Sequence, residues 1–371
     1  MSKLRVAFGV QLLVVVVFTL LWNPLDFSIY RLGGQVVGDG TRLYLEQQAA
    51  HWFTYTPFAA VTFVPLSAVP LVLARTLWAL ASVAAFVVAC RGVLALAGYR
   101  RVLAVVVVGG LLLEPVWHSL FLGQINLMLC ALVVTDLRRG ASGRWAGIGI
   151  GIAAAIKLTP GIFIVLLLAA GRVRAAMIAG ATFAGGTLLG FLVAPDASLV
   201  YWRDIFYDTT RVGVPYVSNQ SPYGALVRLP GEVGGWYVLV PLVLGAVGIG
   251  VAAVYARRGD WLAALATTGL TGLLVSPISW SHHWVWALPA LVVLVRDGYR
   301  RAALAAVVVF ATSPMWATRL VDRPGEPWLA VPFTVVQNAY LLLGLALLAH
   351  LTLCLQKRSG TVETAPERVL A

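Results

Sequence analysis

One acidic residue stands at the edge of the first long apolar run of this chain. Asp26 follows the run 6–22 by four residues, in the segment Asn-Pro-Leu-Asp-Phe-Ser-Ile-Tyr-Arg. A carboxylate at a lipid boundary must be solvated or put to use, so such residues are candidates for a functional site. Asp26 is therefore such a candidate. It could also cap a helix that begins near Phe27, because aspartate is a preferred N-cap residue.

A second charged residue interrupts an apolar stretch between two arginine-bearing loops. Lys157 begins the segment Lys-Leu-Thr-Pro, inside the apolar sequence between Arg144 and Arg172. Pro160 prevents a regular helix through this segment and suits the first turn of a following helix. Broken helices at membrane depth occur where they line a cavity or are buried in protein. We therefore predict that Lys157 faces a cavity, although its side chain could instead extend to the interface.

Further polar and aromatic residues collect in the segments expected on the same side as Asp26. Cationic groups suit a phosphate, and amides beside aromatic rings suit a sugar. The candidates for phosphate binding are Lys157, His282, His283, Arg31 and Arg211. The candidates for binding sugar or acceptor are Gln124, Asn126, Asn219, Tyr223, Tyr55 and Trp280. Structural roles stay open for them, since a histidine pair can form a turn, amides can join helices and aromatic residues can form an interfacial belt.

Metal and nucleotide signatures are weak or missing. The expected outer segments contain no Asp-x-Asp motif, and His282 and His283 are adjacent, which directs their side chains apart on a helix. We therefore expect no metal and no other cofactor. No Walker loop and no glycine fingerprint after a strand is present, so the sequence does not predict a nucleotide site. A sugar donor used outside the cytoplasm would then be linked to a lipid.

The composition identifies an integral membrane protein. The chain has 371 residues, of which 60% are hydrophobic and 11% are charged, whereas a soluble domain averages about 25% charged residues. The net charge of +12 is spread among short loops, which is typical of membrane topology rather than of nucleic-acid binding. We expect one membrane domain over residues 1–355 and a short, disordered cytoplasmic tail over 356–371.

Basic residues set the expected topology, because they concentrate in cytoplasmic loops. Both termini are expected in the cytoplasm of a plasma-membrane protein, and Asp26 on the periplasmic, outer face. The prediction is an all-α polytopic fold of about 12 membrane helices, with juxtamembrane helices within 23–73 on the outer face. The expected spans are 6–22, 76–97, 102–113, 119–137, 175–194, 236–255, 261–278, 284–295, 302–314 and 329–353. Two half-helices, 145–157 and 160–170, form a broken hairpin with Lys157 near its tip.

Six short segments, taken in order, resemble those of glycosyltransferase family 87 in the GT-C superfamily. They are Phe-Thr-Tyr-Thr-Pro-Phe-Ala-Ala at 53–60, Val-Pro-Leu at 64–66, Gly-Gln-Ile-Asn at 123–126, Lys-Leu-Thr-Pro at 157–160, Asn-Gln-Ser at 219–221 and Ser-Pro-Ile-Ser-Trp-Ser-His-His-Trp at 276–284. Each segment alone is weakly specific, but together they are specific, and the resemblance covers about residues 22 to 290. Thr56 departs from the family, which usually has proline there.

The resemblance implies a chemistry as well as a fold. This family includes polyprenyl-phosphate-mannose-dependent α-(1→2)-mannosyltransferases, which act on phosphatidylinositol mannosides or related glycolipids. It implies a lipid-linked mannose donor, a glycolipid acceptor, inversion at the anomeric carbon and an aspartate base, which matches Asp26 here. The leaving phosphate would then need cations, for which Lys157, His282 and His283 are the first candidates. Two alternatives remain: transfer of another polyprenyl-linked sugar such as arabinofuranose or glucose, and a lipid or sugar transporter.

Overall fold

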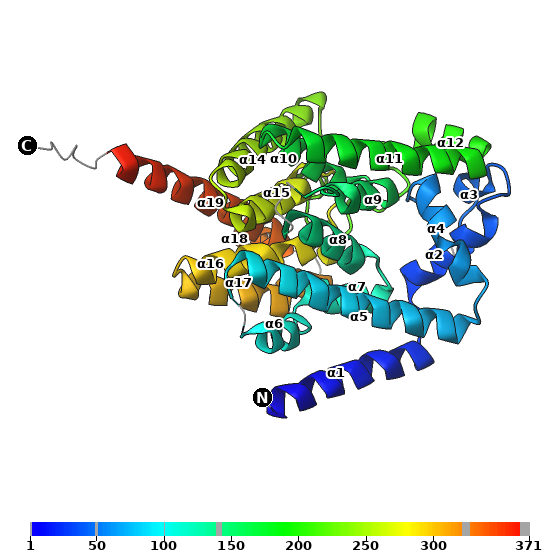
Figure 1. Cartoon of the computed structure of the whole chain (residues 1–371), viewed down its shortest axis with the longest axis horizontal. Helices are drawn as coiled ribbons and strands as arrows, with labels where there is room; N and C mark the ends of the chain where they lie inside the picture. Colours follow the sequence, from blue (N-terminus) through cyan, green and yellow to red (C-terminus); the bar gives the residue numbers. More distant parts are fainter. Residues whose placement is uncertain (1, 49–50, 100, 139–142, 321–326, 364–371) are drawn as a thin grey trace, which may run out of the picture.

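The computed structural model describes residues 2–48, 51–99, 101–138, 143–320 and 327–363, and this part of the chain is almost entirely helical (Figure 1). Its only β-type pairings are two isolated bridges, Gln48 with His51 and Asn219 with Trp280. The α-helices are α1 (Ser2–Leu21), α2 (Leu25–Val36), α3 (Arg42–Leu45), α4 (Pro57–Ser67), α5 (Leu71–Leu96), α6 (Leu103–Gly110), α7 (Glu114–Leu122), α8 (Asn126–Arg138), α9 (Ile148–Ile156), α10 (Ile162–Ala169), α11 (Val173–Val193), α12 (Pro195–Val200), α13 (Pro222–Val227), α14 (Leu239–Arg257), α15 (Trp261–Val275), α16 (Ala287–Arg296), α17 (Arg300–Thr312), α18 (Pro327–Gln337) and α19 (Ala339–Glu363).

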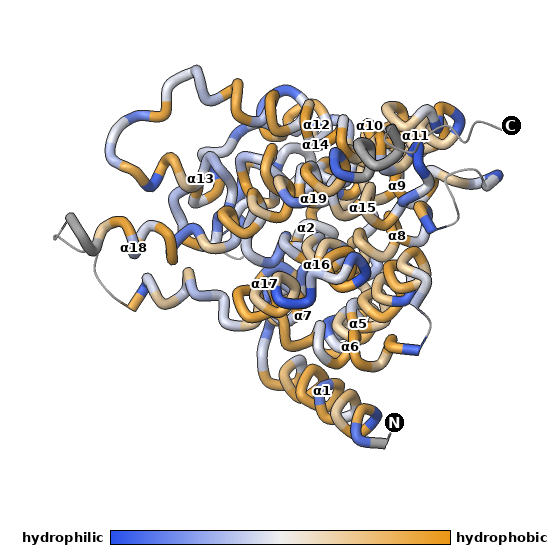
Figure 2. The backbone as a smooth tube through the Cα atoms, turned by 90° about the vertical axis from the view of Figure 1, so that its left-hand side faces the viewer, coloured by the Kyte–Doolittle hydropathy of each residue, from blue (hydrophilic) through white to orange (hydrophobic). Residues whose placement is uncertain are grey.

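The described helices confirm a multi-pass membrane protein. Six of them are long and apolar enough to cross a bilayer, and the pair α6 and α7, bent by 64°, could make a seventh. Figure 1 shows α1, α5 and α11 along the long axis of the molecule, with α2, α3, α4 and α12 gathered at one end. Figure 2 shows α1 as a largely apolar helix at the edge of the bundle. Exposed apolar faces of this kind suit contact with lipid.

The expected number of about 12 membrane helices is not confirmed. Several predicted spans are short helices, namely α8 with 13 residues, α15 with 15 and α16 with 10. A full crossing needs about 20 residues. The predicted run 329–353 also divides, because α18 ends at Gln337 and α19 begins at Ala339. Apolar composition alone does not distinguish a short buried helix from a span.

The segment predicted as a broken hairpin does turn back on itself. Helix α9 ends at Ile156, Lys157 is extended, and a short 3₁₀ turn (Thr159–Gly161) leads into α10. Helix α9 packs closely along α11: a Cβ on Gly147 would lie 2.1 Å from the Ala175 carbonyl oxygen, and one on Gly151 would lie 2.5 Å from that of Ala179. The start of α9 therefore lies beside the start of α11, and the chain between them runs out and returns.

Three helices, α2, α3 and α4, lie in the segment between α1 and α5, where helices were expected within 23–73. Helix α2 begins directly after Pro24, and the described part of the polar stretch 38–55 contains one short helix, the four-residue α3. Thr56 is the N-cap of α4: its hydroxyl accepts a hydrogen bond from the Ala59 N–H and donates one to the Ala155 carbonyl. The threonine that departs from the family pattern thus supports the start of a helix and connects it to α9.

The expected division into a membrane domain over 1–355 and a tail over 356–371 stays a prediction. Helix α19 continues to Glu363, beyond the domain limit expected at residue 355. Residues 364–371 of the expected tail lie outside the described residues.

Candidate active site

Asp26 lies in the first turn of α2. The N-cap of this helix is Pro24, with no side-chain capping bond, so Asp26 does not serve as the cap. The N–H groups at a helix start carry a partial positive charge that favours a nearby carboxylate. Asp26 is therefore available to the space in front of α2.

A fixed amide holds the Asp26 carboxyl. The hydroxyls of Tyr30 and Tyr55 lie 2.7 Å apart, and each is 2.9 Å from Oε1 of Gln124. The Gln124 side chain also interacts with the Asp26 carboxyl, and this interaction lowers the pKa of Asp26. Because two phenol groups occupy the amide oxygen, the N–H group is directed at the carboxylate, where a donor is needed. Tyr55 and Gln124, predicted to contact substrate, thus also position the predicted base.

The backbone conformation and the packing at position 123 require the glycine that begins the segment Gly-Gln-Ile-Asn. It ends α7 in the left-handed conformation, with φ of 72°. A Cβ at this position would lie 2.7 Å from Cβ of Phe27 and 3.1 Å from Cβ of Pro24. Glycine therefore permits the close approach of α7 to the start of α2 that brings Gln124 to Asp26.

Burial changes the proton affinity of Asp26. Desolvation raises the pKa of this carboxyl from 3.8 to about 6, although the hydrogen bond from Gln124 and the charge of Lys157 oppose the rise. A base works best when its pKa lies near the working pH. Asp26 is thus ionised at neutral pH and is a stronger proton acceptor than an exposed aspartate.

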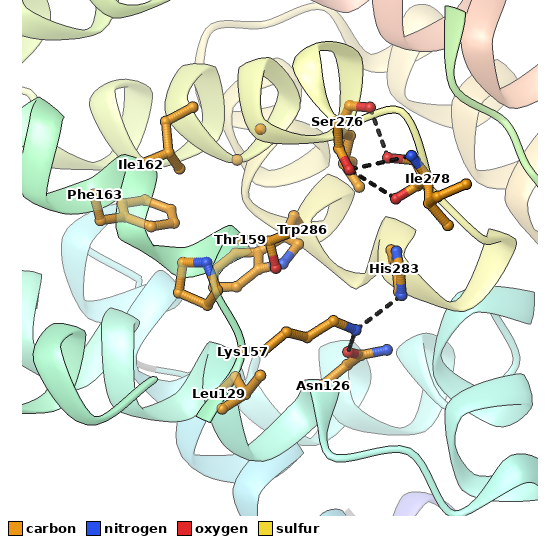
Figure 3. Close-up of a pocket in the computed structure, with 15 residues that line it drawn as sticks. Asn126, Leu129, Lys157, Thr159, Ile162, Phe163, Ser276, Ile278, His283 and Trp286 are labelled. Carbon is orange, nitrogen blue, oxygen red and sulfur yellow. Dashed lines mark hydrogen bonds between the residues drawn. The ribbon is translucent and has the colours of Figure 1, made fainter. Parts of the chain in front are cut away.

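Lys157 is held at the bend between α9 and α10 by three polar groups. Its ammonium lies 2.9 Å from Nε2 of His283, 3.2 Å from Oδ1 of Asn126 and 3.5 Å from the Tyr55 hydroxyl. Figure 3 shows the lysine side chain directed toward His283 and Asn126. None of these three partners is a carboxylate, so the ammonium keeps its capacity to bind an anion.

The protonation states of Lys157 and His283 differ from the expectation that several cations would bind the phosphate. Burial, followed by the nearby Lys157 charge, holds the pKa of His283 well below its usual range. The ring is therefore neutral, and its Nε2 accepts a hydrogen bond from Lys157. Burial also lowers the pKa of Lys157 to about 8, with the charge of Asp26 opposing the change. At neutral pH the lysine supplies the positive charge and His283 orients it.

Asp26 and Lys157 line the same cavity, which has a volume of about 350 Å³. They do not form an ion pair with each other among the described residues. Two opposite charges that share a cavity without pairing leave room for a substrate between them. Tyr55, Gln124 and Trp280 also line this cavity, as their predicted roles require. Asn126 lines a smaller pocket of about 30 Å³ beside Lys157 (Figure 3).

Two predicted sugar-binding residues lie away from the cavity lining. Asn219 is fully buried, and its side chain bonds the carbonyls of Val214 and Pro277 and the Ser279 N–H, so it holds the loop that carries Trp280. Tyr223 packs against Tyr237, with ring centroids 4.9 Å apart. Neither placement supports direct contact with a sugar.

The predicted phosphate ligands also differ in whether they line the cavity. Arg31 donates to the carbonyls of Leu66, Ser67 and Val69 at the end of α4 and is absent from the cavity lining. Its position indicates a structural role at the C-terminus of that helix.

Arg211 does line the cavity, but its positive charge is partly neutralised by a neighbouring carboxylate. Its Nε lies 3.4 Å from the Asp208 carboxylate, it donates to the Tyr44 carbonyl, and its guanidinium lies 4.4 Å from the ring centroid of Trp52. Arg211 could contact an anion only together with Asp208.

His282 is buried behind His283, and its ring centroid lies 4.7 Å from that of His283. Neither ring nitrogen of His282 has a hydrogen-bond partner among the described residues. It does not line the cavity, so its predicted contact with phosphate has no support from its position.

The segment after α12 contributes wall residues that the sequence did not single out. Tyr201, Tyr207 and Asp208 line the cavity, and residues Tyr201–Ile205 form a turn of π-helix. Such turns occur frequently at functional sites. The Tyr-Trp-Arg-Asp sequence at 201–204 was a signal of an aromatic and charged surface, but it did not indicate which side chains face inward.

A buried carboxylate fixes the histidine-bearing segment behind the cavity. Glu114 is fully buried, and it accepts hydrogen bonds from His118, Ser281, Trp316 and Tyr340 at 2.7–3.1 Å. Because Ser281 begins the turn that carries His283, Glu114 positions the partner of Lys157. Within the described residues no group of three or more metal-binding side chains occurs.

Comparison with known proteins now decides the family. A model of glycosyltransferase family 87 matches residues 53–277, which include Tyr55, Gln124 and Lys157. The chain belongs to this family. The transferase is thus assigned by a match over more than half of its sequence, and the match contains most of the cavity described above.

Its relatives include three mannosyltransferases. A polyprenol-phosphate-mannose-dependent alpha-(1-2)-phosphatidylinositol mannoside mannosyltransferase of Mycobacterium tuberculosis is 35% identical over 329 residues, 78% of this chain and 76% of the relative. A protein of the same description from Mycolicibacterium smegmatis is 33% identical over 76% of this chain and 71% of the relative. A phosphatidylinositol pentamannoside mannosyltransferase of M. tuberculosis is 35% identical over 75% of this chain and 64% of the relative. No solved structure matches the transferase.

Proposed function

We propose that this family 87 transferase moves mannose from polyprenyl-phosphate mannose to a mannose hydroxyl of a phosphatidylinositol mannoside or lipomannan-type glycolipid, forming an α-(1→2) linkage. The observation that carries the proposal is the unpaired placement of Asp26 and Lys157 in one cavity. The names of the relatives support the donor and the acceptor class.

The proposed reaction is a single displacement with inversion. The acceptor oxygen forms a bond to the anomeric carbon while Asp26 takes the hydroxyl proton, and the bond from that carbon to the phosphate oxygen breaks. The transition state has oxocarbenium character, as in glycoside hydrolysis. The polyprenyl phosphate leaves as an anion, so it needs no proton from a second carboxylic acid. Lys157 would stabilise its developing charge.

The surrounding residues support these two roles. Gln124 directs an amide N–H at Asp26, and Asn126 and His283 orient the Lys157 ammonium. Trp280 and Tyr55 provide aromatic surface in the same cavity, where a pyranose ring could stack. Preorganised groups of this kind lower the barrier because they need little rearrangement during reaction.

The cavity is proposed to open on the outer face of the plasma membrane, with both chain termini on the cytoplasmic side. The three cysteines of the chain, Cys90, Cys130 and Cys354, are buried. The labelling of an introduced surface cysteine can therefore be measured without removing them. In intact cells, an impermeant thiol reagent should label Asp204→Cys, near the cavity, and should not label Arg174→Cys, at the far end of α11. The reverse pattern would place the site in the cytoplasm.

Transfer is expected to be independent of metal, because Lys157 provides the charge that a divalent cation would otherwise supply to the phosphate. EDTA should therefore change the initial rate by less than about twofold. A strong loss that added Mg²⁺ or Mn²⁺ restores would contradict this expectation. The measurement is the rate of radiolabelled mannose transfer in detergent with and without chelator.

The activity should have a bell-shaped dependence on pH. Asp26 acts when ionised, and its raised pKa of about 6 predicts that kcat/KM falls below that pH. Lys157 acts when protonated, and its lowered pKa of about 8 predicts a fall above that pH. Removing the hydrogen bond that favours the ionised carboxyl, in Gln124→Leu, should move the acid limb to higher pH. An acid limb that stays in place would contradict the role of Gln124.

Product analysis is the direct test of the proposal. Purified protein is incubated with polyprenyl-phosphate mannose and a panel of mannoside acceptors, and the product linkage is determined. An α-(1→2)-linked mannose is the expected product. Transfer only from polyprenyl-phosphate arabinofuranose would identify the alternative donor, and substrate movement across vesicles without a new glycosidic bond would identify a transporter.

A further inference from the structure

A second polar cavity lies at the opposite end of the helices from Asp26. It has a volume of about 590 Å³ and is lined by Arg91 of α5 and Arg138 of α8, together with Leu94 and Tyr99. Helix α8 begins at Asn126, which contacts Lys157, and ends at Arg138. Its 13 residues correspond to about 20 Å of helix. This arginine cavity is therefore remote from the proposed reaction.

Close packing of two helices brings the arginines to one edge. A Cβ on Gly92 would lie 2.4 Å from Cγ1 of Val134, so only a glycine permits α5 and α8 to approach this closely. Arg91 precedes Gly92, and Arg138 follows Val134 by one helical turn. Both arginine side chains consequently line the same cavity, although they come from helices separated in the sequence.

Among the described residues, no acidic side chain neutralises the two guanidinium groups. The lining of the cavity contains no carboxylate, and neither arginine belongs to an ion pair of the described residues. The nearest carboxylate along α8, Asp136, is buried and accepts hydrogen bonds from the N–H groups of Gly147 and Ile150, each at 3.0 Å. The cavity therefore presents two positive charges without a carboxylate partner, which suit an anion.

An apolar groove continues from the arginine cavity toward the middle of the helices. It has a volume of about 240 Å³, shares Leu94 and Tyr99 with the cavity, and is otherwise lined by aliphatic residues and glycines of α6, α16 and α17 and of the adjoining turns. Figure 1 shows α5, α6, α16 and α17 grouped on the same side of the molecule. A Cβ on Gly109 would meet nothing within 4 Å, so the groove is open at this glycine.

We propose that the arginine cavity and this groove bind an anionic phospholipid of the adjacent membrane leaflet. The lipid phosphate would lie between Arg91 and Arg138, and an acyl chain would lie along the groove past Gly109. Basic residues at span ends often reflect topology alone, but here they share a cavity that leads into an apolar groove. Basic pockets between membrane helices are known to bind anionic head groups. The site is separate from the donor phosphate proposed at Lys157.

Lipid binding is measured on the purified full chain, independently of sugar transfer. The protein is exchanged into neutral detergent and titrated with phosphatidylglycerol or phosphatidylcholine, and bound lipid is counted by native mass spectrometry. We expect tighter binding of phosphatidylglycerol, and roughly 30-fold weaker binding in Arg91→Gln/Arg138→Gln, given the attraction of each arginine to an anionic head group. Gly109→Leu, which fills the groove and keeps both charges, should also weaken binding.

A matched control removes the same charge at another site. Arg300→Gln/Arg301→Gln changes two exposed arginines at the start of α17, outside the cavity, and should bind phosphatidylglycerol like the unaltered protein. The proposal is overturned if the control loses as much binding as Arg91→Gln/Arg138→Gln, or if that double variant and Gly109→Leu both bind normally. Neither result depends on mannose transfer, so failure here leaves the proposed activity in place.

Discussion

Asp26→Asn should reduce mannose transfer by about 10³-fold or more, within or above the range usual for loss of a general base. The amide keeps the shape of the side chain and can still accept a hydrogen bond from Gln124, but it cannot take the acceptor proton. The measurement is kcat/KM with polyprenyl-phosphate mannose and a mannoside acceptor. Binding of the lipid donor should change little, because the donor phosphate is proposed to lie at Lys157.

The stability of this variant separates catalysis from folding. Burial raises the pKa of Asp26 from 3.8 to about 6, so the folded chain holds this proton more tightly than the unfolded chain. The resulting stabilisation is present below about pH 4 and is lost as the pH rises through about 6. At pH 7.5 a neutral asparagine removes the cost of the buried charge, and the Tm should stay the same or rise. Full activity in Asp26→Asn would refute the role of Asp26 as base.

A matched control comes from the same end of the molecule. Asp204 is exposed and does not line the cavity, so Asp204→Asn should transfer mannose at nearly the normal rate. If both asparagine variants lose activity together, the effect arises from the charge of this surface rather than from a base.

Lys157→Met should lower kcat/KM for the lipid donor by roughly 10²-fold to 10³-fold, because it removes the charge that stabilises the leaving phosphate. Methionine keeps much of the length of the lysine stem and cannot donate to an anion. The KM for the acceptor should change by less than about threefold, because the acceptor hydroxyl is proposed to meet Asp26 instead. Initial rates over a grid of donor and acceptor concentrations give both values.

Two comparisons make the lysine result specific. Arg203→Met removes an exposed positive charge outside the cavity lining and should leave donor use unchanged. The acid limb of the pH profile should also move to higher pH in Lys157→Met, because the lysine charge lowers the pKa of Asp26. Equal losses for donor and acceptor, with an unmoved acid limb, would contradict phosphate binding by Lys157.

Local sequence features predicted the membrane class and the break at Lys157. Composition is a property of the whole chain, and Pro160 restricts the backbone wherever it occurs, so both inferences survive without knowledge of the packing. The expected count of spans was not confirmed, because several predicted spans contain helices of only 10 to 15 residues. The hydropathy of a run indicates that its residues are shielded from water, but it does not distinguish shielding by lipid from shielding by protein.

The sequence by itself determined that this is a family 87 membrane protein with an acidic residue after its first apolar helix and a lysine at a break between two half-helices. The tertiary structure decided which candidates meet. It placed Tyr55, Gln124, Trp280 and His283 around one cavity with both charged residues, and it placed Arg31, Asn219, Tyr223 and His282 outside the cavity lining. The physical reason is that the packing of distant helices, including the close approach that Gly123 permits, fixes where side chains point, whereas residue type and spacing fix only what they could do.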